Sequence, residues 1–206
     1  MSRRKGKLFV ISGPSGAGKG TICAELLKEE NARFSVSMTT RAPREGEIEG
    51  KDYYFVTREE FVANIERENF LEYAEVFENM YGTPKDVIMR MLNKGRNMIL
   101  DIDVQGALQV KSAMPEAILI FILPPSLAEL RKRLEGRKTD KQDVIEKRLD
   151  KALNEIKLIG EYDYYIINDD IETAIEKARS IVSAESCKVP DKVKPIIKIY
   201  ENEKGE

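Results

Sequence analysis

The stretch GPSGAGKGT, residues 13–21, follows directly on the apolar run 8–11 and precedes a helical pattern of apolar and charged residues. Its glycines and lysine have the spacing G-x-x-x-x-G-K, which is typical of a phosphate-binding loop between a strand and a helix. In such a loop, backbone N–H groups and the partly positive helix N-terminus hold phosphate oxygens. The alternative is a glycine-rich turn that precedes a helix by chance, and the flanking strand and helix patterns disfavour it.

This loop supplies the first candidate site residues. Lys19 is expected to reach the β- and γ-phosphates of a nucleotide as a point charge. The usual motif continues with Ser or Thr, whose hydroxyl binds Mg²⁺, but this chain has Gly20 and then Thr21. We therefore expect Thr21 to contact the metal directly or through water. The candidate ATP-binding residues of the loop are Gly13, Pro14, Ser15, Gly16, Ala17, Gly18, Lys19, Gly20 and Thr21.

The composition limits the class of protein. At 206 residues and 42% apolar content, the chain can bury one full core with small inserted lobes. The net charge of −2 excludes a nucleic-acid footprint over the whole surface. The longest apolar run, 117–123, is too short to span a membrane. We therefore expect neither nucleic acid nor a membrane as a partner.

The chain has no histidine, which excludes Ser-His-Asp hydrolysis, Cys-His proteolysis and His-based zinc chemistry. Cys23 and Cys187 lie far apart in the sequence, without other metal-ligating residues nearby, so we interpret them as free thiols in a reducing compartment. The apolar run 8–11 that follows the basic N-terminal residues is too short for a signal peptide. These features predict a cytoplasmic protein.

Strands and helices alternate along most of the chain. The apolar runs 7–12, 97–103, 117–123 and 162–168 predict buried strands, and helices are expected from the loop to about residue 30, over 143–160 and over 170–184. This alternation predicts an α/β fold with an open parallel sheet flanked by helices. The tail 185–206 is expected to pack one short apolar piece or to fray.

The segment 34–95 departs from this alternation. The run 34–41 is expected to be a strand that runs into a loop, and the runs 53–56 and 70–77 are expected to be strands. Thr57 and Glu60 have the spacing of a capping box at the start of a helix. Thr83 is expected to cap a second helix, with Pro84 at its first position. We interpret this segment as a mixed, partly antiparallel insert.

Two arginines in the insert form a candidate phosphate clamp. Arg41 and Arg44 lie three residues apart in a loop stiffened by a proline, and planar guanidinium groups bind phosphate in a bidentate manner. Tyr53 could add a neutral donor. The alternative is an ordinary charged surface loop, because Glu45, Glu47 and Glu49 partly balance the arginines.

A pair of acids follows the strand at 97–103. Strand side chains alternate between faces, so Asp101 and Asp103 are expected to point the same way at the end of the strand. In an open α/β sheet this end lies beside the phosphate-binding loop, where one acid could order Lys19 or a Mg²⁺ water shell. The alternative is a pair of solvent-facing acids in a turn.

A single acid in the apolar strand 70–77 is a candidate base reader. A carboxylate at Glu72 could accept both N1–H and N2–H of guanine, while the hydroxyl of Tyr81 or Thr83 donates to O6. Adenine presents an acceptor nitrogen to the same carboxylate, so such a site could discriminate by about 10⁴. Periodicity alone favours the alternative, in which Glu72 faces solvent.

The segment 130–148 is rich in arginine and lysine. A closing loop that brings arginines to the transferring phosphate stabilises its charge and expels water. The alternative is a solvated helix face balanced by Glu129 and Glu135, which is expected to account for about half of these residues.

Taken together, several ordered motifs resemble the guanylate kinase family. They are GPSGAGKGT, FSVSMTTRAPREGEIEGKDYYFV, FLEYAEVFENMYGT, LDIDVQG, LRKRLEGR and IINDD, and they run from about residue 7 to residue 184. The resemblance implies a P-loop kinase fold with a mixed α+β insert and a helical lid. It also implies direct in-line transfer of the γ-phosphoryl group of ATP to GMP or dGMP, with Mg²⁺, to give ADP and GDP or dGDP.

The resemblance also implies a role for individual residues. The GMP-binding candidates are Ser37, Arg41, Arg44, Tyr53, Glu72, Tyr81, Thr83, Asp101 and Asp103. The catalytic candidates are Lys19, Arg41, Asp101, Arg137 and Arg148. Arg133, Arg137 and Asn168 join the loop as ATP-binding candidates. Lys138 departs from the family pattern, because a glycine is frequent at its position in relatives.

The implied domains are a core with the P-loop (1–33, 96–129 and 149–184), a GMP-binding lobe (34–95), a lid (130–148) and the tail 185–206. Two other functions remain open on sequence grounds. One is a non-catalytic guanylate-kinase-like module that binds phosphopeptides, and the other is a P-loop kinase for a different phosphorylated acceptor. The sequence does not decide between a monomer and a homo-oligomer.

Overall fold

The computed structural model describes residues 5–76, 78–136, 142–189 and 193–204. Its central element is a parallel sheet with the strand order β2-β7-β1-β8-β9. The strands are β1 (Leu8–Ser12), β2 (Ala32–Phe34), β7 (Asn97–Asp101), β8 (Ile118–Leu123) and β9 (Tyr164–Ile167). The predicted parallel α/β sheet is therefore confirmed.

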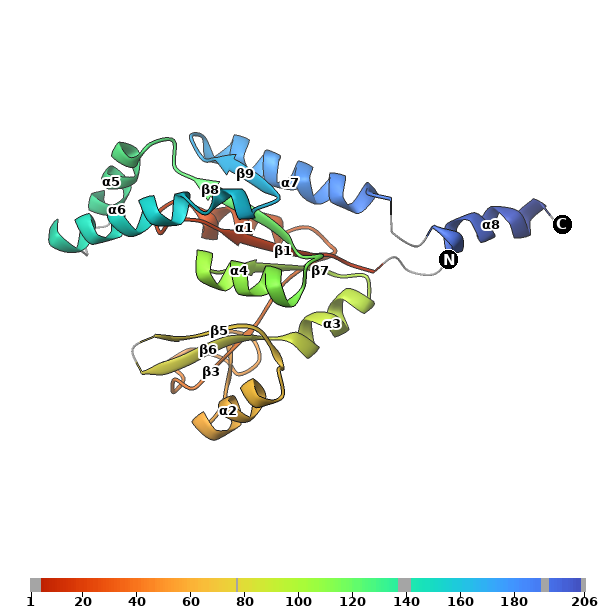
Figure 1. Cartoon of the computed structure of the whole chain (residues 1–206), viewed down its shortest axis with the longest axis horizontal. Coiled ribbons are helices and arrows are strands. Elements are labelled where there is room, and N and C mark those ends of the chain that lie inside the picture. The colour runs from red at the N-terminus through yellow and green to blue at the C-terminus, as the bar shows by residue number, and fades with distance from the viewer. Residues whose placement is uncertain (1–4, 77, 137–141, 190–192, 205–206) are drawn as a thin grey trace.

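Helices cover both faces of this sheet (Figure 1). α1 (Lys19–Leu26) and α7 (Ile171–Cys187) pack on the face that carries Phe9 and Ile11, whereas α3 (Lys85–Asn93) and α4 (Val104–Ala113) pack on the face of Leu8 and Val10. Because both faces are covered, every residue of β1 is buried. This explains why the core strands are continuous apolar runs rather than alternating ones.

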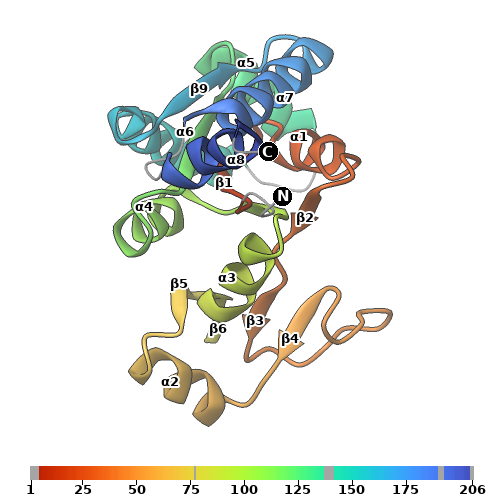
Figure 2. The same ribbon diagram turned by 90° about the vertical axis from the view of Figure 1, so that its right-hand side faces the viewer.

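A second sheet lies apart from the core, with the order β4-β3-β6-β5 (Figure 2). Its strands are β3 (Ser37–Thr39), β4 (Tyr53–Phe55), β5 (Phe70–Val76) and β6 (Asn79–Pro84). β3 and β4 are parallel and the other pairs are antiparallel, so the sheet is mixed as predicted. α2 (Arg58–Glu66) covers one face, where the Phe61 ring stacks on Phe70 at 4.5 Å. The predicted capping box of Thr57 and Glu60 starts this helix.

Two helices flank residues 137–141. α5 (Leu127–Gly136) and α6 (Gln142–Ile156) pack against each other through a small apolar cluster of their own. The cluster consists of Leu130, Leu134, Ile145, Leu149 and Ala152. A short 3-10 helix, η1 (Ile159–Glu161), then leads to β9. This cluster contains no side chain of the core sheet, so the α5–α6 pair is a satellite of the core.

The segment 34–41, predicted as one strand running into a loop, contains parts of two strands in different sheets, so the prediction of a single strand was wrong. β2 ends at Phe34 in the core sheet, and β3 begins at Ser37 in the second sheet. Ser35 still donates its backbone N–H to Ile99 O of the core, so the chain changes sheets immediately after it. Alternation of polarity continues through the crossing, and periodicity alone therefore could not reveal it.

The predicted cap at Thr83 was also wrong. β6 continues through Pro84, and α3 begins at Lys85 without a side-chain cap bond at Pro84. The Thr83 hydroxyl instead donates to Oε1 of Glu72 across the β5–β6 pair, at 2.6 Å. The hydroxyl that was predicted to cap a helix therefore bonds to a half-buried carboxylate on the neighbouring strand.

The helix boundaries also differ from the expectation. α1 ends at Leu26 rather than near residue 30, and α7 extends to Cys187. The tail forms a further helix, α8 (Lys194–Lys204), which projects away from the core (Figure 1). None of the helices in the described part of the chain is long and apolar enough to cross a membrane.

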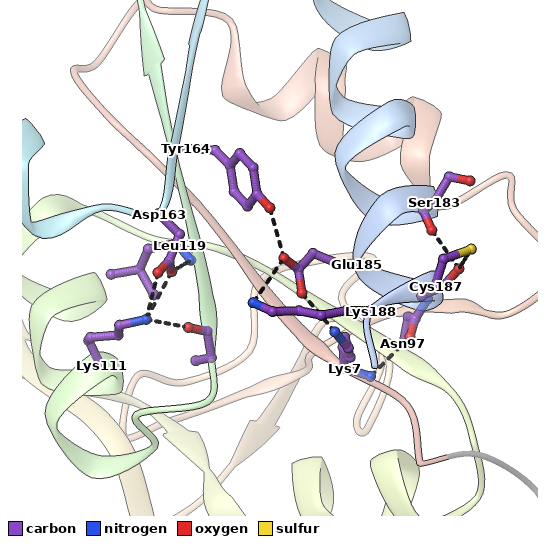
Figure 3. A network of polar contacts seen from close by, with 12 residues as sticks. Lys7, Asn97, Lys111, Leu119, Asp163, Tyr164, Ser183, Glu185, Cys187 and Lys188 are labelled. Atoms are coloured by element: carbon purple, nitrogen blue, oxygen red, sulfur yellow. Dashed lines mark hydrogen bonds and ion pairs between the residues drawn. The ribbon is translucent and has the colours of Figure 1, made fainter. Parts of the chain in front are cut away.

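A polar network holds the C-terminal turn of α7 against the amino ends of the core strands (Figure 3). The carboxylate of Glu185 is buried and accepts hydrogen bonds from Lys7 Nζ at 2.7 Å and the Tyr164 hydroxyl at 2.8 Å. Burial raises the pKa of this carboxyl, but the bonds from Lys7 and Tyr164 outweigh it and leave the pKa lowered. This anchor explains why the helix continues beyond its predicted end.

Candidate active site

The phosphate-binding loop is fixed by backbone geometry. Gly18 has φ of 96°, in the left-handed region that disfavours side chains. A Cβ at this position would lie 2.2 Å from Nδ2 of Asn168. Gly13 also has a positive φ, and a Cβ there would lie 2.3 Å from the carbonyl oxygen of Ile122. The loop therefore passes so close to β8 and to the end of β9 that only glycine fits at these two positions.

Asn168 and Arg133, both predicted to bind ATP, contact the loop or each other. Asn168 is buried, and its Nδ2 donates to Ala17 O at 2.7 Å. Arg133 donates through Nη2 to Asn168 O at 2.9 Å and through Nε to Glu129 at 3.2 Å. These bonds connect α5 to the phosphate loop through the end of β9. Both residues therefore lie at the predicted site, where they brace the loop.

Lys19 begins α1 and folds back over the loop. Its ammonium group donates to Gly13 O at 2.6 Å and to Pro14 O at 3.2 Å. Burial lowers the pKa of Lys19, and attraction to Asp101 opposes this shift. Burial likewise raises the pKa of Asp101, opposed by Lys19. The two groups thus form a partly buried pair of opposite charge at the base of the site.

A pocket of about 460 Å³ extends along the loop. It is lined by Gly13, Ser15, Gly16, Gly18, Lys19, Gly20, Thr21, Asp101, Ile102, Asp103, Arg148, Lys151 and Glu155. The structure therefore brings together the predicted loop residues, both predicted acids and the predicted Arg148. Arg137 lies outside the described residues.

Sequence reasoning missed three residues of this pocket: Ile102, and Lys151 and Glu155 on α6. The ammonium of Lys151 lies 3.9 Å from the Asp103 carboxylate and 3.5 Å from that of Glu155. Burial raises the pKa of Glu155. The signal was present in the spacing, because residues 148, 151 and 155 share one helix face. It was hidden in a segment so rich in charge that a solvated face explained it equally well.

Asp101 and Asp103 reach the pocket differently from the prediction. β7 ends at Asp101, so the two acids do not alternate along one strand. Asp103 instead caps α4, where its Oδ1 accepts the backbone N–H of Gly106 at 2.9 Å. Both acids still line the same pocket, because the strand-to-helix turn carries them to the edge beside the phosphate loop.

Glu72 is not the solvent-facing acid that periodicity favoured. Its Oε1 accepts from the Thr83 hydroxyl, and a Cβ at Gly106 would lie 3.2 Å from its Oε2. Burial is the main cause of a raised pKa at Glu72, and the negative charge of Asp103 adds to it. The carboxyl therefore lies at the junction of the second sheet and α4, beside Asp103.

Several predicted residues lie close to Arg41 on the second sheet. Its guanidinium carbon lies 5.5 Å from the centre of the Tyr53 ring, and this ring lies 6.0 Å from that of Tyr81. Ser37 pairs with Tyr53 in the β3–β4 register. The exposed Arg44 donates its backbone N–H to Glu47. None of these residues lines the pocket along the phosphate loop. The predicted site residues in the described part of the chain therefore form two groups, one around the phosphate loop and one around Arg41. Glu72 and Asp103 lie where the two groups meet.

Comparison with known proteins identifies the family. A family model described as guanylate kinase matches residues 5–185. The guanylate kinase of Clostridium tetani is 53% identical over 193 residues, which cover 94% of this chain and 92% of the relative. The chain belongs to the guanylate kinase family. The guanylate kinase of Clostridioides difficile is 50% identical over 204 residues, covering 98% of this chain and 100% of the relative.

A solved structure agrees with this family. The crystal structure of guanylate kinase from Anaplasma phagocytophilum superposes with a TM-score of 0.69 at 40% identity, covering 92% of this chain and 90% of that one. As a member of the guanylate kinase family, the protein is a phosphotransferase that converts GMP to GDP with ATP. The reaction of the family uses a divalent metal ion.

Proposed function

We propose that two parts of the molecule hold the two nucleotides. The pocket along the phosphate loop, with Lys19 at its base, holds the phosphates of ATP. The second sheet, within residues 34–95, holds GMP or dGMP. The lid, residues 130–148, which takes in parts of α5 and α6, closes over ATP. The bracing of the loop by Arg133 and Asn168 supports this division, because it ties α5 to the phosphate site.

In this proposal, Glu72, Thr83, Asp103 and Ser37 read the guanine base. Glu72 accepts the two N–H groups on one edge of guanine, which needs the ionised carboxylate. Its partial burial supports this role, because a hydrogen bond to a charged group is strong where water is excluded. The phosphate of GMP is held by Arg41, Arg44, Tyr53 and Tyr81.

The residues around Lys19 fit a magnesium ion. The Thr21 hydroxyl and the Asp101 carboxylate both line the pocket, and both offer the oxygen ligands that Mg²⁺ prefers. A Cβ at Gly20 would lie 3.8 Å from Asp101 Oδ2, so Asp101 faces the position where the usual motif has a hydroxyl residue. We propose Mg²⁺ as the divalent metal, with Thr21 and Asp101 holding it directly or through water. When bound, it neutralises charge on the phosphates.

The chain's own residues then act through position and charge. The acceptor is a phosphate oxygen, which is already nucleophilic, so no strong general base is needed. Lys19 and the loop N–H groups hold the transferring phosphate in line, and Arg148 adds positive charge from α6. Closure of α5 and α6 would exclude water, which competes with GMP as an acceptor.

One observation supports this proposal: Asp103 lines the pocket along the phosphate loop and also caps the turn of α4 that lies against Glu72. The two sites therefore adjoin at the first turn of α4. A GMP molecule held at Glu72 would lie at the edge of the pocket that holds ATP.

A panel of acceptors tests the assignment. With ATP as donor, we expect rapid ADP formation with GMP and dGMP and rates lower by about 10⁴ with AMP, dTMP and UMP, because their bases leave Glu72 without matched donors. Coupled ADP release measures each rate. Comparable rates with AMP and GMP would contradict the role of Glu72.

The location and remaining partners complete the proposal. We infer a cytoplasmic enzyme whose partners are the small molecules ATP and GMP or dGMP. Cys23 and Cys187 are both free, as expected in a reducing compartment. Cys23 is buried, and burial raises its pKa to about 12, so this thiol is unreactive despite its place behind the phosphate loop.

A further inference from the structure

We propose that Glu47 is a positioning residue for the GMP phosphate: it holds the Arg41 guanidinium in the orientation in which the phosphate is bound. The proposal rests on the assignment of Arg41 to the GMP phosphate in the proposed function. It gives a role to a residue to which neither the sequence motifs nor that assignment gave one. On sequence alone, Glu47 was only a charge that balanced the loop.

The contacts of Glu47 are short and converge on one loop. Arg41 donates from Nη2 to Oε1 of Glu47 at 2.8 Å and to Oε2 at 3.0 Å. Oε2 also accepts the backbone N–H of Arg44 at 2.7 Å. The two side chains are only 15% and 20% exposed. A single carboxylate therefore ties together both members of the predicted phosphate clamp.

A tight turn brings this carboxylate back to the arginines. The backbone N–H of Glu47 donates to Arg44 O at 3.1 Å, and Gly46, inside the turn, has φ of 86°. Only glycine adopts this conformation without strain. The turn at Gly46 thus reverses the chain, so that Glu47, its last residue, reaches Arg41 within the same loop.

Other groups fix Arg41 from further sides. Its guanidinium carbon lies 5.5 Å from the ring centre of Tyr53 and 5.9 Å from that of Phe55. Nη1 donates to Ala42 O at 2.7 Å. Arginine loses several rotamers when it binds a ligand, and a guanidinium already fixed by ring faces and a carboxylate avoids much of that cost.

Geometry favours positioning over competition with the substrate. Both bonds to Glu47 use the single nitrogen Nη2, and a guanidinium has five N–H donors. Nε and the second hydrogen of Nη1 are therefore outside the Glu47 pair. A phosphate could bind at that edge while Glu47 remains in place. If Glu47 occupied the phosphate position itself, its removal would strengthen GMP binding, so the two readings predict opposite signs.

The experiment compares Glu47 with Glu45, an exposed acid in the same loop that changes the net charge equally. The variants Glu47→Ala, Glu47→Gln, Glu45→Ala and Glu45→Gln are measured for the Kd of GMP, the Kd of guanosine and the KM of ATP. We expect Glu47→Ala to weaken GMP binding by about tenfold and Glu47→Gln by less, because glutamine keeps one acceptor. Guanosine binding and the KM of ATP stay within twofold, as do all values for the Glu45 variants.

Three results would overturn the proposal. They are an unchanged Kd of GMP in Glu47→Ala, a tighter Kd in either Glu47 variant, and an equal loss for guanosine, which has no phosphate. Thermal unfolding of each variant shows whether it is folded. If Glu47→Ala is unfolded, the same comparison is made with Glu47→Gln alone, for which an unchanged or tighter Kd of GMP overturns the proposal.

An Arg41→Ala variant separates this proposal from the proposed function. If Arg41→Ala weakens GMP binding and Glu47→Ala has no further effect in that background, the two residues act as one unit and the proposal is supported. If Arg41→Ala binds GMP normally, the phosphate assignment itself fails. If Arg41→Ala weakens binding and Glu47→Ala alone does not, only the role of Glu47 fails.

Discussion

The phosphate loop and the Arg41 loop are both assigned to phosphate, but they are built differently. The phosphate loop is fixed by backbone: glycines with positive φ, close contacts to β8 and β9, and a lysine that bonds to its own loop. The Arg41 loop is fixed by side chains: a carboxylate, a guanidinium and aromatic rings on a small sheet. Backbone geometry cannot adjust to substitution, whereas a side-chain cluster loses strength gradually.

The largest expected effect tests the charge in the backbone-built site. Lys19→Ala is expected to lower kcat by about 10³-fold, because Lys19 supplies the charge at the transferring phosphate. Folding should remain intact, since the close contacts of the glycines and the bond from Asn168 still hold the loop when the two Lys19 bonds are lost. Steady-state kinetics and thermal unfolding measure the two quantities. Turnover within tenfold of the unmodified protein would contradict this role.

The next effect concerns the side-chain-built site. Glu72→Gln is expected to raise the KM of GMP by about 10- to 100-fold, because an amide replaces a charged acceptor with a neutral one. The KM of ATP should change less than twofold, since Glu72 is not among the residues that line the ATP pocket. Kinetics with each substrate varied in turn provide the measurement. An unchanged KM of GMP would mean that Glu72 only bonds to Thr83.

A pair of glycine variants compares the two loops directly. Gly18→Ala meets both an unfavourable φ and the buried Asn168, whereas Gly46→Ala meets an unfavourable φ with no atom within 4 Å. The strain of φ costs about 1–2 kcal/mol in each case, and the contact with Asn168 adds about 1–3 kcal/mol for Gly18→Ala alone. Denaturant unfolding measures both free energies. Equal losses would show that Asn168 moves aside without cost.

The smallest expected effect is on the pH dependence of the reaction: the KM of GMP should change on the acid side and kcat on the alkaline side. Because burial raises the pKa of Glu72, this carboxyl takes up a proton at a higher pH than an ordinary glutamate. The KM of GMP should therefore rise several-fold in mildly acidic solution, and this rise should be absent in Glu72→Gln. Because burial lowers the pKa of Lys19, kcat should fall on the alkaline side before an ordinary lysine would titrate. Measurement of the KM of GMP and of kcat as functions of pH, in the unmodified protein and in Glu72→Gln, tests both expectations.

The raised pKa of Glu72 also affects the free energy of unfolding. A carboxyl with a raised pKa binds its proton more tightly in the folded state, so folding opposes its ionisation. The contribution of Glu72 to the free energy of unfolding is therefore fully present below the pKa of an ordinary glutamate and is lost as the pH rises from there through the raised pKa of the folded state. Glu185 has the opposite sign, because its pKa is lowered: its contribution is present at neutral pH and is lost as the pH falls through its folded pKa.

Some features of the fold were predictable from the sequence and others were not. The core strands, the phosphate loop and the capping box of α2 were predictable because apolar runs, glycine spacing and capping residues act over a few positions. The crossing between β2 and β3 and the extension of β6 through Thr83 were not. Each depends on a partner distant in the chain, Ile99 for Ser35 and Glu72 for Thr83.

The candidate site shows the same division. The sequence and its family resemblance named Lys19, Asp101, Asp103 and Arg148 as site residues, and all four line one pocket. They did not name Lys151 or Glu155, and they treated Glu47 as a surface charge. A charged residue in a charged segment carries no local signal, so its role emerges only when the fold shows which group it faces.

The sequence by itself determined that this chain folds around a phosphate-binding loop at the end of a buried parallel strand. Glycine spacing and apolar runs are local properties, and together they indicate a strand, a phosphate-binding loop and a helix in that order. Only the tertiary structure decided which charges meet. Lys19 and Asp101 line the same pocket, Asp103 caps α4 beside Glu72, and Glu47 bonds to Arg41. The interaction of charges depends on their distance and burial, and both are set by the packing of segments far apart in the chain.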